Sequence, residues 1–215
     1  HNPNPGVRGR AFHAVVAAQT RPAKVLPALQ DTDPRVRSRA TYLLTKLGGD
    51  PLVAREDPDP RVRIAAFRAA SLAANDAQRM PLLRQFADDT DLGVRRALLL
   101  QFAQWRPNLQ TPEIEEGLGL WLQFAKSFQG DRTYLDALGH AAEADTERLY
   151  PKLVAELGAQ PLAWSKRFAD LVWRLHPNAA IPALRERALA RTLGTAQRRR
   201  ALIALSFCSD RTAAR

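Results

Sequence analysis

Metal-binding and redox-active residues are few in this 215-residue sequence. It contains one cysteine, Cys208, and four histidines that lie far apart, His1, His13, His140 and His176. A single cysteine excludes an internal disulfide, a Cys-x-x-Cys zinc site and a haem-attachment motif within the sequence. None of the histidines has the i, i+4 spacing by which one helix presents two metal ligands. We therefore expect no metal site and no cofactor, and we interpret Cys208 as a small buried side chain.

Long apolar runs and aromatic residues are also scarce. No apolar run approaches the roughly 20 residues that span a bilayer, and there is no signal-peptide pattern. Aromatic residues make up 7% of the sequence, while Ala and Leu recur throughout, which favours closely packed helices over a β-sandwich. No segment alternates apolar and polar residues between turn residues, so we predict no strand.

Catalytic patterns are absent as well. The sequence has no glycine-rich phosphate loop and no serine in a nucleophile-elbow context. We interpret Glu115, Glu116 and Glu143 as solvated helix faces rather than general acids. Gly117 and Gly119 fall inside a helical pattern and are interpreted as a weak point of that helix. We therefore predict that no residue of this sequence is catalytic and that the chain is not an enzyme.

A short pattern recurs four times in the first half of the sequence. The four stretches are Asn4–Arg8, Asp33–Arg37, Asp59–Arg63 and Asp91–Arg95, and their valines are 29, 26 and 32 residues apart. Each begins with Asp or Asn, the residues preferred as helix N-caps. Proline, which suits the first helical position, follows in three of the four. Each stretch therefore predicts the start of a helix whose valine faces the core.

Further helices are predicted between and beyond these starts. Between them we expect shorter helices at Ala23–Leu29, Leu52–Arg55 and Ala77–Ala87. Beyond Pro107 the capping and stop signals predict Glu113–Phe128, Arg132–Ala144, Thr146–Leu157, Lys166–Leu175, Ala179–Leu193 and Ala196–Phe207.

The arginine of the pattern needs a partner, because a cation in the first turn meets the positive end of the helix dipole. The cap aspartate of the following stretch is the simplest candidate, so that Arg37 faces Asp59 and Arg63 faces Asp91. Asp33 and Arg95 are the outer members of this predicted inter-repeat ladder. Each part-exposed pair is worth about 0–1 kcal/mol, so the ladder would fix register more than stability.

The Asp-Pro-x-Val-Arg starts resemble those of HEAT and HEAT-like repeats. The resemblance implies an all-α fold, a right-handed superhelical solenoid of antiparallel helix pairs, and an Asp–Arg ladder between repeats. It covers about residues 1–106, and we expect residues 107–215 to form divergent helical pairs. A single pair cannot bury both apolar faces, so stacking is required. We accordingly predict one solenoid over residues 1–215, as a segment of a longer protein.

Two stretches of the second half carry a second resemblance. Asp131–Gly139 and Phe168–Pro177 resemble the helical region of large dehydrogenase-like proteins of planctomycete and verrucomicrobial type. Those proteins join a sugar-dehydrogenase-like β-propeller, a HEAT-repeat region and a c-type haem domain. This sequence has neither the haem-attachment motif nor a propeller, so no redox residue carries over. The resemblance implies a spacer outside the cytoplasm; the residues alone leave the compartment unknown.

The leading functional hypothesis is therefore a non-enzymatic protein-interaction or spacer scaffold within a larger redox protein. Its partners would be other proteins or neighbouring domains of the same chain, and this segment would not insert into a membrane.

The charge distribution supports an alternative. Residues 1–107 carry a net charge of +7, residues 108–160 carry −5 and residues 161–215 carry +8. A basic helical solenoid can bind DNA through its phosphates, and alkylpurine DNA glycosylases use a HEAT-like solenoid in this way. Features that invite the comparison are the candidate anion patch of Arg198, Arg199 and Arg200, and the tryptophans Trp105, Trp121, Trp164 and Trp173.

Overall fold

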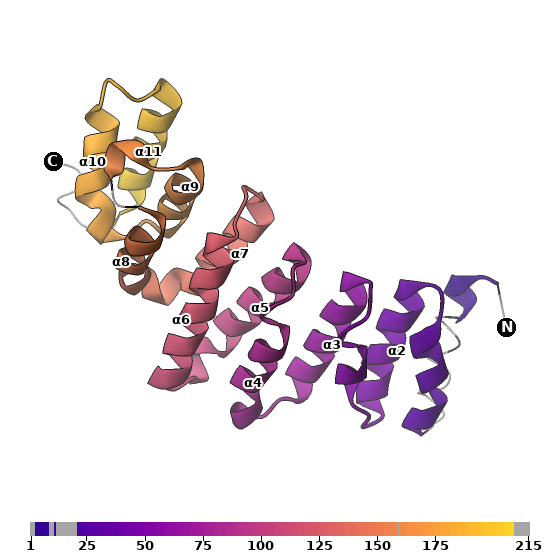
Figure 1. The fold of residues 1–215 in the computed structure, drawn as a ribbon. Helices are drawn as coiled ribbons and strands as arrows, with labels where there is room; N and C mark the ends of the chain where they lie inside the picture. Colours follow the sequence, from indigo (N-terminus) through magenta and orange to yellow (C-terminus); the bar gives the residue numbers. More distant parts are fainter. Residues whose placement is uncertain (1–2, 9–10, 12–20, 159, 209–215) are drawn as a thin grey trace. The chain divides into compact units, whose positions relative to one another are not determined.

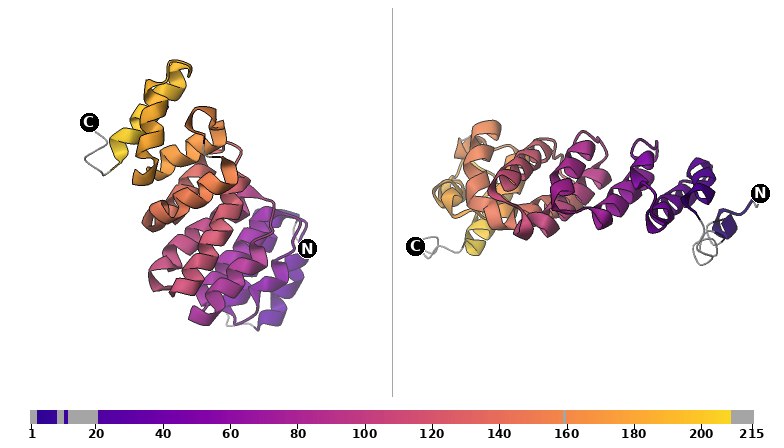
Figure 2. Two further views of the ribbon diagram at one scale, coloured as in Figure 1. Left: turned by 60° about the vertical axis from the view of Figure 1, so that its left-hand side comes forward. Right: turned by 90° about the horizontal axis from the view of Figure 1, so that it is seen from below.

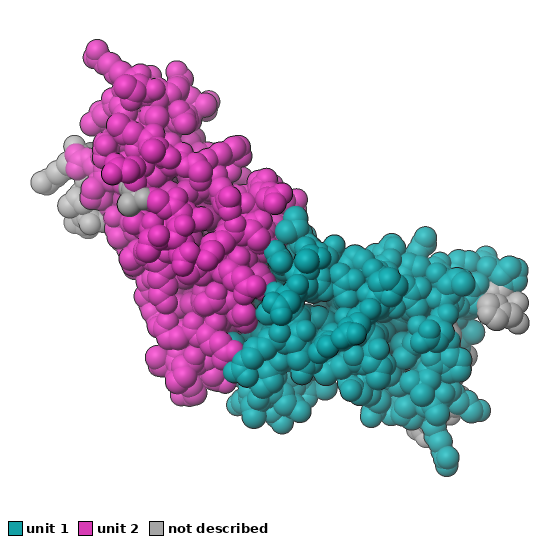
Figure 3. All heavy atoms as spheres, viewed as in Figure 1, with its two compact units in different colours: residues 1–101 teal, residues 102–215 magenta. Residues whose placement is uncertain are grey.

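The computed structural model describes residues 3–8, 11, 21–158 and 160–208 (Figure 1). Within these ranges every regular element is a helix and no β-strand occurs, as predicted. None of the described helices has both the length and the apolar character that a membrane span requires. The chain divides into two compact units, residues 1–101 and residues 102–215, which are coloured separately in Figure 3. His1 and His13, for which we predict no metal-binding role, lie outside the described residues.

Short 3₁₀ segments alternate with longer α-helices at the start of unit 1. In chain order the elements are η1 (Pro22–Lys24), η2 (Leu26–Gln30), α2 (Pro34–Lys46), η3 (Pro51–Ala54), α3 (Pro60–Ala73), α4 (Asp76–Phe86) and α5 (Leu92–Trp105). The division between the two units falls near the end of α5. The predicted helix Ala23–Leu29 is thus replaced by η1 and η2, and Pro27, which lies inside the predicted range, lacks the amide donor that an α-helix would use there.

The recurring helix starts are formed as the sequence indicates. The Asp33 side chain accepts a hydrogen bond from the Arg35 amide, and the Asp59 side chain accepts one from the Arg61 amide, at 2.8 and 2.9 Å. Pro34 occupies the first turn of α2, where its missing N–H is not needed. The N-cap assignments for α2 and α3 are therefore confirmed.

The core of unit 1 is built from the recurring valines and the apolar residues that follow them. Val36, Val62 and Val94 are at most 2% exposed, and Ala40 and Ala66, one turn later, are fully buried. Val7 of the first stretch is half-buried. Helix α2 packs against α3 and against η2 and η3, and α3 packs against η3 and α4. The α2–α3 neighbourhood is visible in both views of Figure 2.

Unit 2 contains six α-helices with 3₁₀ turns between them in its described residues. In chain order the α-helices and 3₁₀ turns are η4 (Arg106–Asn108), α6 (Thr111–Lys126), α7 (Arg132–Ala142), η5 (Glu143–Asp145), α8 (Thr146–Leu157), η6 (Pro161–Ala163), α9 (Lys166–Leu175), η7 (Asn178–Ala180), α10 (Ile181–Leu189) and α11 (Thr195–Phe207). Helix α6 packs on α7 and α8, α9 packs on α7, α8 and α11, and α10 packs on α11.

Local capping explains most helix limits in unit 2. Asp131 accepts from the Tyr134 amide and Ser165 accepts from the Phe168 amide, as their positions before the helices predict. Helix α8 ends at Gly158, whose φ of 99° favours glycine. Several limits differ from prediction: α6 begins and ends two residues earlier than Glu113–Phe128, α7 ends at Ala142 instead of Ala144, and α10 ends at Leu189 instead of Leu193. Asn178 begins a 3₁₀ turn instead of capping α10, and α11 begins at Thr195, with Gly194 at the cap position.

Candidate functional site

Successive turns of unit 1 are joined by repeated arginine–aspartate pairs. The Arg37 guanidinium donates from Nε and Nη2 to the two carboxylate oxygens of Asp57, at 2.8 and 2.9 Å. Arg63 makes the same two-bond contact with Asp89, at 2.6 and 3.0 Å. Arg8 makes it with Asp31, with both distances 2.7 Å. These three pairs, Arg8–Asp31, Arg37–Asp57 and Arg63–Asp89, are referred to below as the rungs.

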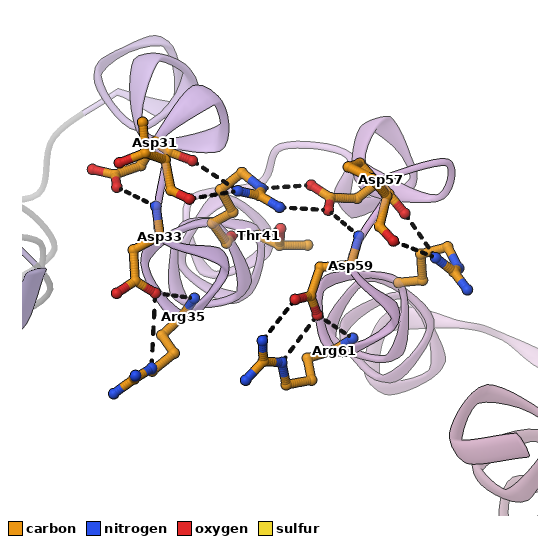
Figure 4. Close-up of polar contacts among 11 residues, drawn as sticks. Asp31, Asp33, Arg35, Thr41, Asp57, Asp59 and Arg61 are labelled. Carbon is orange, nitrogen blue, oxygen red and sulfur yellow. Dashed lines mark hydrogen bonds and ion pairs between the residues drawn. The ribbon is translucent and has the colours of Figure 1, made fainter. Parts of the chain in front are cut away.

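The predicted pairing of Arg37 with Asp59 and of Arg63 with Asp91 is wrong. The acceptor lies two residues earlier, at Asp57 and Asp89. The reason is that the cap aspartates are already engaged at their own helix starts. Figure 4 shows Asp33 bonded to Arg35, and Asp59 bonded to Arg61.

Each rung also ties down the loop before its own helix. The Arg37 Nη1 donates to the carbonyl of Asp31 at 2.8 Å, and the Arg63 Nη1 donates to the carbonyl of Asp57 at 2.9 Å. The Asp57 carboxylate in turn accepts from the Asp59 amide at 2.9 Å. One guanidinium thus connects two consecutive loops, and one carboxylate holds the following N-cap in place. Arg95 repeats the inner half of this arrangement, donating from Nε to the Asp89 carbonyl.

Hydrogen bonds lower the pKa of two rung carboxylates, Asp31 and Asp89, and of the cap carboxylate Asp59. The hydrogen bond from Arg8 lowers the pKa of Asp31 against the opposing effect of burial. The hydrogen bond from Arg61 lowers the pKa of Asp59 to about 2. Burial alone raises the pKa of Asp89, but the hydrogen bonds from Arg63 and the Asp91 amide outweigh it. The Asp31 and Asp89 carboxylates are therefore ionised at neutral pH and form ion pairs with their arginines.

A related charge cluster lies in unit 2 and was not predicted from the sequence. Arg106 donates from Nε and Nη2 to Asp145, at 2.8 and 2.9 Å, and the Asp145 side chain is only 1% exposed. Arg148 bonds both Asp145 and Glu115, and Glu115 also pairs with Lys152 at 3.1 Å. Glu115 is therefore an ion-pair partner. Arg106 and Asp145 lie 39 residues apart, so no local sequence pattern could predict their pairing.

The candidate anion patch is not brought together as one surface. Arg199 is exposed, whereas Arg198 and Arg200 are half-buried. Consecutive helical residues point about 100° apart, so three adjacent arginines cannot share one face of α11. Arg200 forms an ion pair with Asp170 of α9, which also accepts from Lys166 at 2.8 Å.

Arg200 instead lines a cavity of about 460 Å³ between the last three helices. Helix α9 contributes Lys166 and Trp173, α10 contributes Leu184 and Arg187, and Trp164 precedes α9. Two of the four tryptophans thus line the same cavity. The volume lies within the range of about 300–1,000 Å³ that is usual for small-molecule pockets.

Arg187 is the unusual side chain of this cavity. It is 2% exposed, it donates to the Pro161 carbonyl, and its Cζ lies 4.8 Å from the centre of the Trp164 ring. Burial lowers the pKa of Arg187 from its usual value. Among the described residues no carboxylate pairs with it, in contrast to the rung arginines. Sequence reasoning missed Arg187, because a single arginine in an amphipathic helix carries no distinguishing signal.

The other two tryptophans have structural positions in unit 2. Trp121 is fully buried and its indole N–H donates to the Leu138 carbonyl at 2.7 Å. Trp105 is 7% exposed at the end of α5. Gly117 is more than a weak point of α6, because Phe102 packs directly over it and leaves no room for a Cβ.

The remaining candidates stay apart. Within the described ranges, no three His, Cys, Asp or Glu side chains lie close enough together to hold a metal ion. His140 and Glu143 are exposed and lie 3.6 Å apart. The half-buried His176 ring packs against Phe207, with their centres 4.9 Å apart. Cys208 is half-buried rather than buried, with its Sγ 3.5 Å from the Ala204 carbonyl.

Comparison with protein-family models, with curated proteins and with solved structures finds no match to this chain.

Proposed function

We propose that this chain is a HEAT-like solenoid that acts as a non-enzymatic protein-interaction or spacer scaffold. The observation that carries the proposal is the recurrence of the same two-bond arginine–aspartate rung at Arg8–Asp31, Arg37–Asp57 and Arg63–Asp89. A repeated contact between consecutive repeats is what a stacked array needs, because each repeat is stabilised mainly by its neighbours. In such an array the surface is available for partners and no single cleft has to be organised for chemistry.

A surface for the partner can be placed beside one rung. A hollow of about 600 Å³ lies next to Arg37 and Asp57, and the apolar side chains Leu26 and Val53 line it. These side chains are 45% and 61% exposed. Exposed apolar side chains next to a charged pair suit a protein–protein contact, which combines apolar area with polar groups at its edge. We assign this hollow as the contact for a neighbouring domain or partner protein.

The redox context is part of the same proposal and rests on the helical stretches Asp131–Gly139 and Phe168–Pro177. It places the scaffold beside a sugar-dehydrogenase-like propeller and a c-type haem domain, outside the cytoplasm. The complete open reading frame is the direct test. A frame that encodes a propeller and a Cys-x-x-Cys-His domain supports the proposal, and a frame that encodes neither contradicts its redox part.

The interaction itself is tested by calorimetry. The 215-residue chain is titrated with each flanking domain of the complete protein, produced separately. We expect binding by at least one domain, weakened about tenfold or more by Val53→Asp, which desolvates a charge in an apolar contact. Leu72→Asp is the matched control, because Leu72 is 74% exposed and does not line the hollow. Equal effects of the two substitutions would contradict the assignment of the hollow.

A further inference from the structure

The cavity between α9, α10 and α11 has a charge balance that its own residues do not satisfy. Lys166, Arg187 and Arg200 contribute three cations, and the adjacent Asp170 contributes one carboxylate. Asp170 is shared between Lys166 and Arg200. This sharing leaves Arg187 without an anionic partner among the described residues.

The same cavity contains a buried hydrogen-bond donor that has no acceptor within the described ranges. Trp164 is 7% exposed, and its indole N–H is buried with no hydrogen-bond acceptor in the described part of the chain. A buried N–H without an acceptor is destabilising, and so is a buried cation without an opposite charge beside it. Because Arg187 lies over the Trp164 ring, the guanidinium that lacks a carboxylate partner and the indole N–H that lacks an acceptor belong to one small region.

The walls of the cavity are mainly apolar. Trp173, Leu184, Ala169 and Ala201 line it together with the methylene groups of the cationic side chains. A bare inorganic anion would leave these walls without contacts, whereas a ligand with a ring body would cover them. Sites of this composition bind ligands through apolar contact and use a few polar groups to fix orientation.

We propose that this cavity binds a small anion attached to a planar ring system. Arg187 binds the phosphate or carboxylate group, and Trp164 donates a further hydrogen bond to it. Trp173 and Leu184 cover the ring. The proposal is independent of the scaffold function, because it concerns only unit 2 and none of the rungs.

The first experiment is a calorimetric and tryptophan-fluorescence titration of the 215-residue chain with five probes. The anionic probes are AMP and 1-naphthoate, their neutral counterparts are adenosine and 1-naphthalenemethanol, and inorganic phosphate is the ring-free anion. We expect at least one ring anion to bind one-to-one with a Kd below about 1 mM, and its neutral counterpart at least about tenfold more weakly, as the loss of one charge-assisted contact predicts. Preference for AMP identifies a phosphate and preference for 1-naphthoate a carboxylate. Absence of binding by both ring anions, or equal binding of charged and neutral probes, overturns the proposal.

The second experiment compares two arginines of the same helix. Arg187→Gln removes the buried guanidinium, and Arg185→Gln removes an identical charge from an exposed position on α10. We expect Arg187→Gln to raise the Kd of the bound probe about tenfold or more and Arg185→Gln to leave it within about twofold. Equal effects would show a nonspecific charge effect and contradict the assignment.

The third experiment needs no variant at Arg187 and therefore does not depend on its folding. The indole N–H resonances of Trp164 and Trp121 are followed by NMR during titration, with Trp164→Phe used to assign the first. The Trp164 signal is expected to move and to saturate at the calorimetric Kd, while the Trp121 signal, already bonded to the Leu138 carbonyl, stays in place. A bound probe that leaves the Trp164 signal unmoved overturns the proposed site.

Discussion

The Arg37 guanidinium donates two parallel hydrogen bonds to Asp57, 20 residues further along the chain, and a third to the carbonyl of Asp31 in its own loop. Arg63 repeats this arrangement with Asp89 and with the Asp57 carbonyl. The arginine of the recurring pattern thus holds the loop before its own helix and also contacts the loop of the next repeat. Two-bond arginine–aspartate contacts are geometrically more specific than single ion pairs.

Removal of one rung should destabilise unit 1. Arg63→Gln leaves the Asp89 carboxylate, which is 9% exposed, without its main partner. We expect the free energy of unfolding to fall by about 1–3 kcal/mol, the usual cost of losing hydrogen bonds to a charged group. Urea denaturation followed by circular dichroism measures the change.

Arg68→Gln is the control for this substitution. Arg68 lies on the same helix, α3, and is exposed. It should leave the urea midpoint unchanged. A similar loss in both variants would show that the charge of α3 matters rather than the rung.

Acid should weaken the helix starts in a defined pH window. Asp59 has a pKa of about 2 in the folded chain, against about 3.9 for an aspartate in the unfolded chain. The unfolded state therefore binds more protons between these values, so the stability contributed by Asp59 is complete above about pH 4 and is lost as the pH falls toward 2. Thermal unfolding measured at pH 5, 4, 3 and 2 should show the decline.

Asp59→Asn separates this contribution from that of other carboxylates, because asparagine also caps helices but does not titrate. Its stability should fall less steeply than that of the wild type between pH 4 and pH 2. Asp88→Asn, at an exposed position, should keep the wild-type slope. Identical slopes in all three proteins would contradict the role given to Asp59.

Two glycines of α6 should respond in opposite directions to alanine. A Cβ at Gly117 would lie 2.0 Å from a ring carbon of the buried Phe102, so Gly117→Ala should destabilise unit 2 by about 1–3 kcal/mol. Nothing lies within 4 Å of a Cβ at Gly119, so Gly119→Ala should gain about 0.5–1 kcal/mol from helix propensity. Chemical denaturation of both variants checks the signs, and a gain at Gly117 would contradict the packing described.

Capping signals made much of the fold predictable. Asp33, Asp59, Asp131 and Ser165 each precede a helix and accept an amide hydrogen bond at its start. These effects are local, because they depend on residues within three positions of each other. The end of the predicted helix Thr146–Leu157 is also set locally, because Gly158, with a φ of 99°, follows it.

Long-range partners were not predictable in the same way. The Asp-x-Asp order offers two acceptors for each rung arginine, and the choice of Asp57 over Asp59 follows from the use of Asp59 as a cap. The cavity likewise joins Trp164, Arg187 and Arg200 from separate elements, and only helix packing brings them together. No spacing in the sequence carries that information.

The scaffold proposal and the DNA-binding alternative predict different affinities for DNA. Several arginines that contribute to the net charge are engaged in ion pairs, including Arg8, Arg37, Arg63, Arg106 and Arg200. We therefore expect a labelled DNA duplex to bind no more tightly than about 10⁻⁴ M at physiological salt, the weak end of nonspecific binding. Fluorescence anisotropy at several salt concentrations measures this. Micromolar affinity that falls steeply with salt, and that is lost when Arg198, Arg199 and Arg200 are replaced by Glu, would favour the DNA-binding alternative.

The claim that rungs join consecutive repeats within unit 1 is tested most directly by two double-mutant cycles measured by urea denaturation. One combines Arg37→Gln with Asp57→Asn, and the other combines Arg37→Gln with Asp59→Asn. We predict a coupling energy of about 1–3 kcal/mol for Arg37 with Asp57 and less than about 0.5 kcal/mol for Arg37 with Asp59. A coupling energy near zero for Arg37 with Asp57, or a larger one for Arg37 with Asp59, would contradict the account.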